Sequence, residues 1–265
     1  MDGMLSQEEI NALLGSMGDS AENTSDVAAS EPTPAAADSN ERLSPEESDA
    51  LGEIANISMG TAATTLSILV NNRVEITTPK LSYVTLDDLK EQNPAPCVFI
   101  YISYRTGLEG KNILVLKEHD VKVITDLMMG GDGTNTDAEL TDLHLSAISE
   151  AMNQMMGSAA TSMSSMINEK VDISPPSSTR VDLANTMMED GLHDMVGQTF
   201  VQVSFRMTIG DLVDSEIMQL YPFDFAKLIY TRFRSTMEGG MEETAASEPE
   251  PAPQPEPVAA PGQQP

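Results

Sequence analysis

Two stretches of the sequence carry the same polar residues at the same spacing. Glu53 to Ala63 reads EIANISMGTAA, and Glu150 to Ala160 reads EAMNQMMGSAA. A glutamate, an asparagine, a glycine and a pair of alanines recur, whereas most of the apolar residues between them have changed. A duplicated structural element usually keeps its apolar residues, so the retained polar residues indicate a function that both copies share.

The recurring side chains favour hydrolysis by a positioned water molecule. Glu53 and Asn56 are about one helical turn apart, as are Glu150 and Asn153, and the recurring set contains no serine, cysteine or histidine nucleophile. A carboxamide both donates and accepts hydrogen bonds, so it can hold a water in line with a labile acyl phosphate. The loose transition state of phosphoryl transfer demands positioning more than a strong base. We expect the carboxylate to pair with a cation on a partner protein and so fix how that partner docks.

A solvated helix face is the simpler alternative, because glutamate is common on such faces and asparagine is tolerated there. Asparagine and glycine in a helix interior nevertheless cost about 1 kcal/mol per helix in stability. The same cost recurs at the same register in both copies, which favours a functional reason for these residues.

Each stretch is predicted to lie in a long amphipathic helix. The first helix is expected to begin with Ser44 as N-cap, Pro45 at the first helical position and Glu47 closing a capping box, and to end near Val70. Its predicted core-facing residues, and then those of the second helix, are Leu51, Ala55, Met59, Ala62 and Leu66, and Ile148, Met152, Met156, Ala159 and Met163. The methionines are interpreted as core filler.

The opposite stripe of each helix is predicted to face solvent along its whole length. Its members, in the first and then the second helix, are Asp49, Glu53, Asn56, Gly60, Ala63 and Ser67, and Ser146, Glu150, Asn153, Gly157, Ala160 and Ser164. A proline follows each asparagine by 23 positions, Pro79 after Asn56 and Pro176 after Asn153, where the chain is expected to begin its strands.

The strand signals are duplicated as well. The β-rich runs VFIYISYR and FVQVSFR are each followed by a glycine, Gly107 or Gly210, then by a second strand and a helix, about 118–129 or 222–233. We therefore predict an α+β fold: an internally duplicated, pseudo-two-fold domain with a central, mainly antiparallel sheet and two long motif-bearing helices. The repeats are expected over about 44–130 and 141–234.

Composition excludes several classes of function. With 14 basic and 42 acidic residues the net charge is −28, which repels nucleic acid and anionic membrane surfaces. Cys97 is the only cysteine and is expected to be a small buried residue; with three histidines it supplies no recognisable metal motif. Neither a secretory signal nor a membrane span is evident, so we expect a cytoplasmic protein.

At the repeated helix positions the sequence resembles the CheC, CheX and FliY family of phosphatases, which act on the chemotaxis response regulator CheY. The family pattern is Asp or Ser, then Glu four positions on, then Asn three positions further, then Pro 23 positions after the Asn. Its full matches are Asp49, Glu53, Asn56 and Pro79, and Ser146, Glu150, Asn153 and Pro176. The resemblance implies that the asparagines position the hydrolytic water and that the glutamates pair with a lysine of the regulator. It also implies a Mg²⁺ ion on the regulator and no cofactor or metal of this chain's own.

The N-terminal residues 1–17 resemble the CheY-binding peptide of flagellar motor switch proteins. Ser6 and Glu9 form a capping pattern ahead of apolar residues at helical spacing. The residues assigned to binding are Leu5, Ser6, Gln7, Glu8, Glu9, Ile10, Asn11, Ala12, Leu13 and Leu14. Residues 18–42 are expected to be a disordered acidic linker, 43–234 a CheC-like phosphatase domain, and 235–265 a disordered tail or linker rich in proline and glutamate.

The peptide together with the doubled motif is typical of the members of this family that belong to the flagellar switch. Such members ordinarily carry a FliN-like domain after a linker, and we expect this chain to lack it. Switch partners such as FliM, FliG and FliN-like proteins are implied if such a domain exists, together with a place at the cytoplasmic face of the flagellar basal body. Phosphorylated CheY is the partner implied in either case.

Two other functions remain open from the residues. The domain could be a non-enzymatic adaptor that only binds CheY, or a hydrolase that uses Glu53 and Glu150 as a carboxylate pair. The second alternative is disfavoured by an aromatic content of 4% with no tryptophan, since sugar sites usually need aromatic platforms. GGDGTNTD, Gly130 to Asp137, is interpreted as a turn and not as a Ca²⁺ or phosphate loop, because it lacks the closing glutamate and a following lysine.

Overall fold

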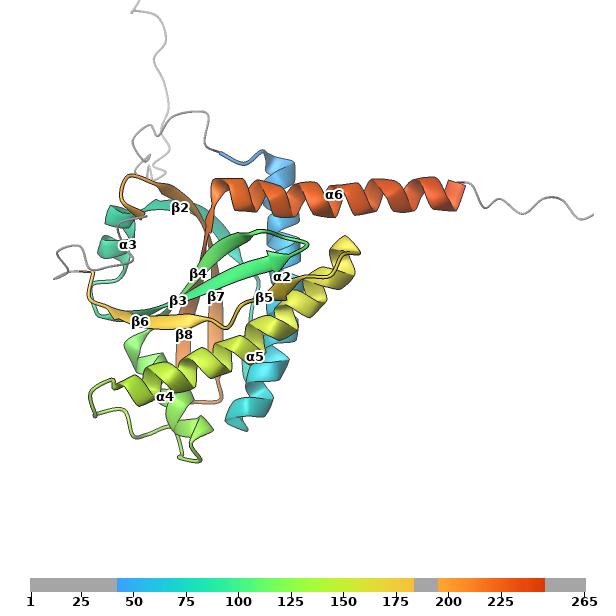
Figure 1. Ribbon diagram of the computed structural model, residues 1–265. Coiled ribbons are helices and arrows are strands. Elements are labelled where there is room, and N and C mark those ends of the chain that lie inside the picture. Colours follow the sequence, from blue (N-terminus) through green and yellow to red (C-terminus); the bar gives the residue numbers. More distant parts are fainter. Residues whose placement is uncertain (1–41, 184–194, 246–265) are drawn as a thin grey trace, which may run out of the picture. The chain divides into compact units, whose positions relative to one another are not determined.

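The computed structural model describes residues 42–183 and 195–245 (Figure 1). The predicted CheY-binding peptide, nearly all of the predicted linker and the chain after Ala245 lie outside the described residues.

Two helices of 26 residues each dominate the fold, α2 (Pro45–Val70) and α5 (Asp142–Ile167). The predicted start of α2 is confirmed: the Ser44 side chain accepts a hydrogen bond from the Glu47 amide, and the Glu47 carboxylate accepts one from the Ser44 amide at 2.7 Å. Both helices end in the same way, since Asn71 and Asn168 adopt left-handed conformations with φ of 48° and 51°. The duplication therefore extends to the helix ends.

Apart from α3, which is described in the first repeat alone, the remaining elements follow in the same order in both repeats. The first repeat continues with β1 (Val74–Ile76), β2 (Lys80–Thr85), α3 (Leu86–Gln92), β3 (Cys97–Thr106), β4 (Gly110–Lys117) and α4 (Glu118–Met128). The second repeat continues with β5 (Asp172–Ile173), β6 (Ser177–Val181), β7 (Thr199–Ile209), β8 (Val213–Pro222) and α6 (Phe223–Ala245).

The strands form one antiparallel sheet of eight strands in which the two repeats exchange their edges. Strands β1 and β2 of the first repeat pair with β7 of the second, where Lys80 lies opposite Ser204. Strands β5 and β6 of the second repeat pair with β3 of the first, where Cys97 lies opposite Val181. The central pair joins β4 to β8. The predicted α+β, pseudo-two-fold architecture is thus confirmed, and each repeat completes the sheet of the other.

Hydrophobic cores lie on both faces of the sheet. The larger core receives side chains from α2, α4, α5 and α6, whereas the smaller one includes Leu89 of α3. The apolar residues that alternate along the sequence of β7, as in a half-buried strand, are all buried: Val201, Val203, Phe205, Met207 and Ile209. Gln202 and Ser204 between them are buried too, because the second core covers the other face of this strand. From Phe200 to Phe205 the strand is therefore buried on both faces, whereas Arg206 is exposed and Thr208 half-buried, so the alternating burial that the sequence predicts occurs only in the second part of the strand.

Two expectations about the helices were wrong. The outward stripe does not face solvent along its whole length, since Ala63 and Ala160 are buried. Each alanine lies next to the core-facing side of its helix. That side covers about half of the helix circumference, because α2 and α5 pack against each other as well as against the sheet. Helix α6 also continues to Ala245, beyond the predicted domain end at 234. The Thr236 hydroxyl of α6 donates a 2.7 Å hydrogen bond to the Ile167 carbonyl at the end of α5, which fixes the extension to the domain.

Cys97 is predicted to be unreactive in the folded protein. Its thiol is buried in the smaller core, and desolvation, with a smaller contribution from the charge of Asp182, raises its pKa to about 12. Because the thiolate is the reactive species, we expect negligible labelling by a thiol reagent at pH 8 and one equivalent of label after denaturation. Rapid labelling of the native protein would contradict this burial.

Among the described residues, every helix is too short or too polar to cross a lipid bilayer.

Candidate functional site

The outward ridge of α2 presents the first copy of the motif to solvent. Asp49, Glu53, Asn56 and Gly60 are all exposed and follow one another at spacings of four, three and four residues, so they lie in one line along the helix. None of the polar side chains among them makes a hydrogen bond or ion pair within the described residues, so the carboxylates and the carboxamide are available to a partner.

The ridge of α5 presents the second copy of the motif with fewer of its residues exposed to solvent. Ser146 and Glu150 are exposed, but Asn153 and Gly157 are half-buried. The Glu150 carboxylate accepts a 2.7 Å hydrogen bond from the Gln154 amide one turn further along the helix. The two copies therefore share the motif and differ in exposure.

A single buried residue of the sheet contacts both motif helices. Gln219 of β8 places its amide nitrogen 3.3 Å from the Met59 sulfur of α2 and 3.9 Å from the Met156 sulfur of α5. Each methionine follows the motif asparagine of its helix by three residues. The Tyr221 hydroxyl donates to the Gln219 oxygen at 2.7 Å and fixes the direction of the amide. No pattern in the sequence indicates this support, because it depends on how the two repeats meet across the sheet.

Each motif helix is tied to the strand that follows it by a serine near its end. The Ser67 hydroxyl accepts from the Val74 amide at 2.9 Å, and the Ser164 hydroxyl accepts from the Val171 amide at 2.8 Å. Both serines belong to the stripe that was predicted to face solvent. Instead, both hydroxyls hold the helix to the strand that follows it. The only sign of this in the sequence is that a serine occurs at the same position in both repeats.

The prolines of the motif lie away from the ridges. Pro79 immediately precedes β2 and Pro176 immediately precedes β6, where a missing backbone donor is tolerated at the start of an edge strand. The strands that they introduce contact the N-terminal half of the helices. In the first repeat, Gly52 of α2 lies against Leu81 of β2, since a Cβ on this glycine would be 3.4 Å from the leucine side chain.

The equivalent contact in the second repeat is polar. Ser149 of α5 and Ser178 of β6 share a hydrogen bond of 2.8 Å between their hydroxyl oxygens. These positions correspond to Gly52 and Leu81 in the first repeat, so both edge strands are held against their helices at the same point by different chemistry. The prolines therefore introduce the two edge strands that contact the motif helices.

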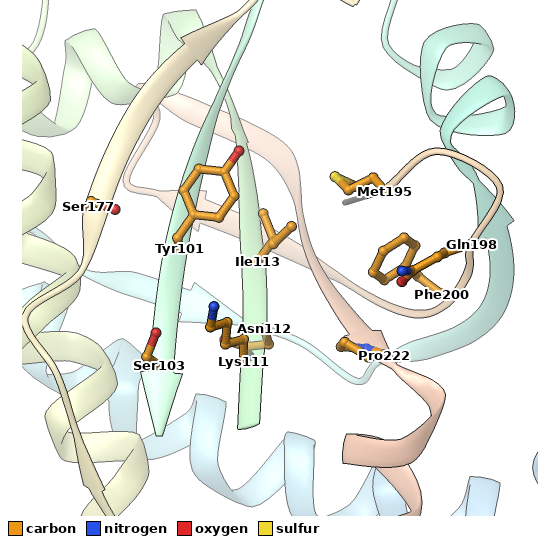
Figure 2. Close-up of a pocket in the computed structure, with 10 residues that line it drawn as sticks. All are labelled: Tyr101, Ser103, Lys111, Asn112, Ile113, Ser177, Met195, Gln198, Phe200 and Pro222. Carbon is orange, nitrogen blue, oxygen red and sulfur yellow. The ribbon is translucent and has the colours of Figure 1, made fainter. Parts of the chain in front are cut away.

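The described hollows lie elsewhere on the protein. In the described part of the chain, three hollows of about 490, 520 and 580 Å³ are lined by residues that belong to neither ridge. Figure 2 shows the one of about 580 Å³, in which Tyr101, Ile113 and Phe200 form part of the wall. Ile113 and Phe200 belong to the smaller core, on the face of the sheet away from α2 and α5. The two ridges thus lie on the surface, outside these three hollows.

The segment from Gly130 to Asp137 forms a turn, as predicted. The Asp126 carboxylate accepts a 2.8 Å hydrogen bond from the Gly133 amide and closes the turn against α4. Within residues 42–183 and 195–245, no three histidine, cysteine, aspartate or glutamate side chains are grouped so that they could hold a metal ion.

Comparison with known proteins links these features to one family. The model of the CheC-like family matches residues 46–83 and 143–180, and each matched segment contains a ridge and its proline. The flagellar motor switch phosphatase FliY of Bacillus subtilis is 44% identical over 245 residues, covering 92% of this chain and 61% of that protein. The chain thus spans about three fifths of the length of this curated relative.

Solved structures show the same fold. The crystal structure of Thermotoga maritima FliY superposes with a TM-score of 0.67 at 38% identity, covering 73% of this chain and 98% of that one. A structure of the FliG–FliM complex from Helicobacter pylori matches with a TM-score of 0.57 at 17% identity, covering 71% of this chain and all of that one, and at this identity it supports the fold alone. On the strength of the doubled motif, the shared fold and the close similarity to FliY, the chain belongs to the CheC-like family.

Proposed function

We propose that this protein hydrolyses the aspartyl phosphate of the chemotaxis response regulator CheY within the flagellar motor switch. The observation that carries the proposal is the placement of Glu53 and Asn56, and of Glu150 and Asn153, on outward ridges. The hydroxyls that also recur along the same stripe, Ser67 and Ser164, are hydrogen-bonded to the following strands, which leaves water as the nucleophile. Membership of the CheC-like family and the similarity to a protein named a flagellar motor switch phosphatase support it.

In the proposed reaction the regulator docks onto a ridge with its acyl phosphate facing the asparagine. The carboxamide of Asn56 or Asn153 accepts a hydrogen bond from a water and holds the oxygen in line with the phosphorus. Water attack breaks the bond between phosphorus and the aspartate oxygen, releasing inorganic phosphate and restoring the carboxylate. The glutamate one turn earlier pairs with a cation of the regulator and sets the register of docking.

The Mg²⁺ ion implied for this chemistry belongs to the regulator, where it neutralises charge on the phosphoryl oxygens. This chain contributes side chains that orient water and partner, and we propose that it needs no cofactor of its own. Residues 5–14 would capture phosphorylated CheY and raise its concentration near the two ridges through the linker. Switch proteins such as FliM and FliG are further candidate partners, at the cytoplasmic face of the flagellar basal body.

A non-enzymatic adaptor is the competing proposal, because the same fold occurs in FliM in the structure of its complex with FliG. The two proposals predict different results for the turnover of phosphorylated CheY. Phosphorylated CheY at tenfold excess over the chain should lose phosphate many times faster than alone, with several turnovers per chain. Binding of CheY without accelerated phosphate loss would favour the adaptor.

Replacing Gly60 and Gly157 by alanine should raise stability and lower activity. A Cβ at either position meets nothing within 4 Å, so alanine should stabilise each helix by about 0.5–1 kcal/mol. If the regulator packs closely over these glycines, the added methyl groups should reduce kcat/KM about tenfold or more. Urea denaturation and phosphate release measure the two effects, and an unchanged kcat/KM would show that the partner does not approach the helices there.

A further inference from the structure

The two ridges differ in the residue that follows the motif asparagine. Ile57 follows Asn56 on α2 and is 42% exposed, one of the few large apolar side chains at the surface of the described structure. Gln154 follows Asn153 at the equivalent position of α5. An exposed isoleucine beside a polar motif offers an apolar contact to any protein that docks there, and covering it would strengthen binding about tenfold. A glutamine at this place offers no such contact.

The residue at this position also determines whether the motif glutamate accepts a hydrogen bond from its own helix. On α5 the Gln154 amide donates to the Glu150 carboxylate at 2.7 Å, so that carboxylate is partly engaged on its own helix. On α2 the isoleucine cannot donate, and Glu53 has no hydrogen bond within the described residues. A cation of the partner must therefore share the Glu150 carboxylate with an intrahelical donor, whereas at Glu53 it has no such competitor. On an exposed helix this difference amounts to about twofold in affinity.

Access to the motif differs in the same direction. Asn56 and Gly60 are exposed, whereas Asn153 and Gly157 are half-buried. A protein partner reaches the α2 ridge with less rearrangement than the α5 ridge.

We propose that residues 57 and 154 set unequal affinities at the two sites, so that the α2 ridge is the tighter docking surface for the phosphorylated regulator. This inference rests on the proposed function. Ile57 packs on an apolar patch of the regulator beside the cation that pairs with Glu53. The α5 ridge acts at higher regulator concentrations, and a chain with both sites responds over a wider range of concentration than either site alone.

The test uses full-length chains with one motif asparagine removed. Asn153→Ala leaves only the α2 site and Asn56→Ala leaves only the α5 site, and initial rates of phosphate loss are measured against the concentration of phosphorylated CheY. We expect the α2 site to have the lower KM, by about tenfold. Ile57→Gln in the Asn153→Ala chain should raise KM about tenfold with kcat changed by less than twofold. Gln154→Ile in the Asn56→Ala chain should lower KM.

Ile68 provides a matched control. It is 76% exposed on the same helix, about 16 Å further along the axis, so Ile68→Gln makes the same chemical change away from the motif. We expect it to leave KM unchanged, with circular dichroism checking that each variant is folded. An unchanged KM in the Ile57→Gln chain, or an equal rise with Ile68→Gln, overturns the inference while the proposed function stands. If neither single-site chain accelerates phosphate loss, the proposed function fails and the inference falls with it.

Discussion

Replacing Asn56 and Asn153 together by alanine should remove the accelerated loss of phosphate from CheY and leave the fold intact. Neither carboxamide makes a hydrogen bond within the described residues, so truncation leaves no buried group unpaired. Alanine is also the better helix former, which slightly favours the folded state. Loss of the group that orients the water should lower kcat by about 10²-fold to 10³-fold at each site.

The measurement is the rate of phosphate release at saturating phosphorylated CheY, with the variant checked by circular dichroism and urea denaturation. Asn135→Ala is a suitable control, because it removes the same carboxamide from an exposed position in the Gly130–Asp137 turn. Its rate should equal that of the unmodified chain. A folded double variant that retains its rate would show that the asparagines do not position the water.

Gly107→Ala should destabilise the domain by about 3 kcal/mol or more, whereas Gly210→Ala should cost only about 1 kcal/mol. Both glycines have positive φ, 71° and 48°, so an alanine is strained at either position by about 1 kcal/mol. A Cβ on Gly107 would also clash with the Lys170 carbonyl oxygen, whereas the nearest atom to a Cβ on Gly210 is 3.8 Å away, on the Asn72 side chain. Backbone has to move in the first case, which adds about 2 kcal/mol.

Urea denaturation followed by circular dichroism compares the two variants, and each serves as the control for the other. Lys170 precedes β5, so Gly107→Ala should also loosen the edge of the sheet where the second repeat joins the first. Faster hydrogen exchange at the Tyr104–Ile173 pairing would report that loosening. Equal losses of stability in the two variants would mean that the backbone at Lys170 moves away from the added methyl group without a further loss of free energy.

The sequence predicted the parts of the fold that are determined locally. Ser44, Pro45 and Glu47 act within one turn of helix, so the start of α2 could be read directly. The hairpin glycines Gly107 and Gly210 could be placed because each follows a β-rich run. The same is true of the ridges, whose residues at the N-terminal half of each helix lie where the periodicity puts them.

The features that were missed depend on distant residues. Ala63 and Ala160 are buried by packing between the helices. Alanine occurs in both buried and exposed positions of helices, so the residue type does not predict this burial. Strands β1 and β5 are short and pair with strands of the other repeat, so no alternating pattern marks them. The extension of α6 has an acidic composition that suggests a linker, and its anchor is the carbonyl of Ile167 in another helix.

One feature of the candidate site was visible and overlooked. Glu150 and Gln154 have both the spacing and the side chains for an intrahelical hydrogen bond, whereas Ile57, at the same spacing from Glu53, has no donor. Comparison of the repeats for their differences, and not only for their shared residues, would have identified position 57.

The exchange of edge strands has a consequence for how the protein is made. Lys80 of β2 pairs with Ser204 of β7, so a ribosome must add more than a hundred residues before β2 can find its partner. At about 5–20 residues per second this takes roughly 6 to 25 seconds. During that time the first repeat carries an unpaired strand edge, and the apolar side of α2 has only part of its final covering. The same dependence means that a gene cut between the repeats would yield two incomplete sheets and not two separate single-site proteins.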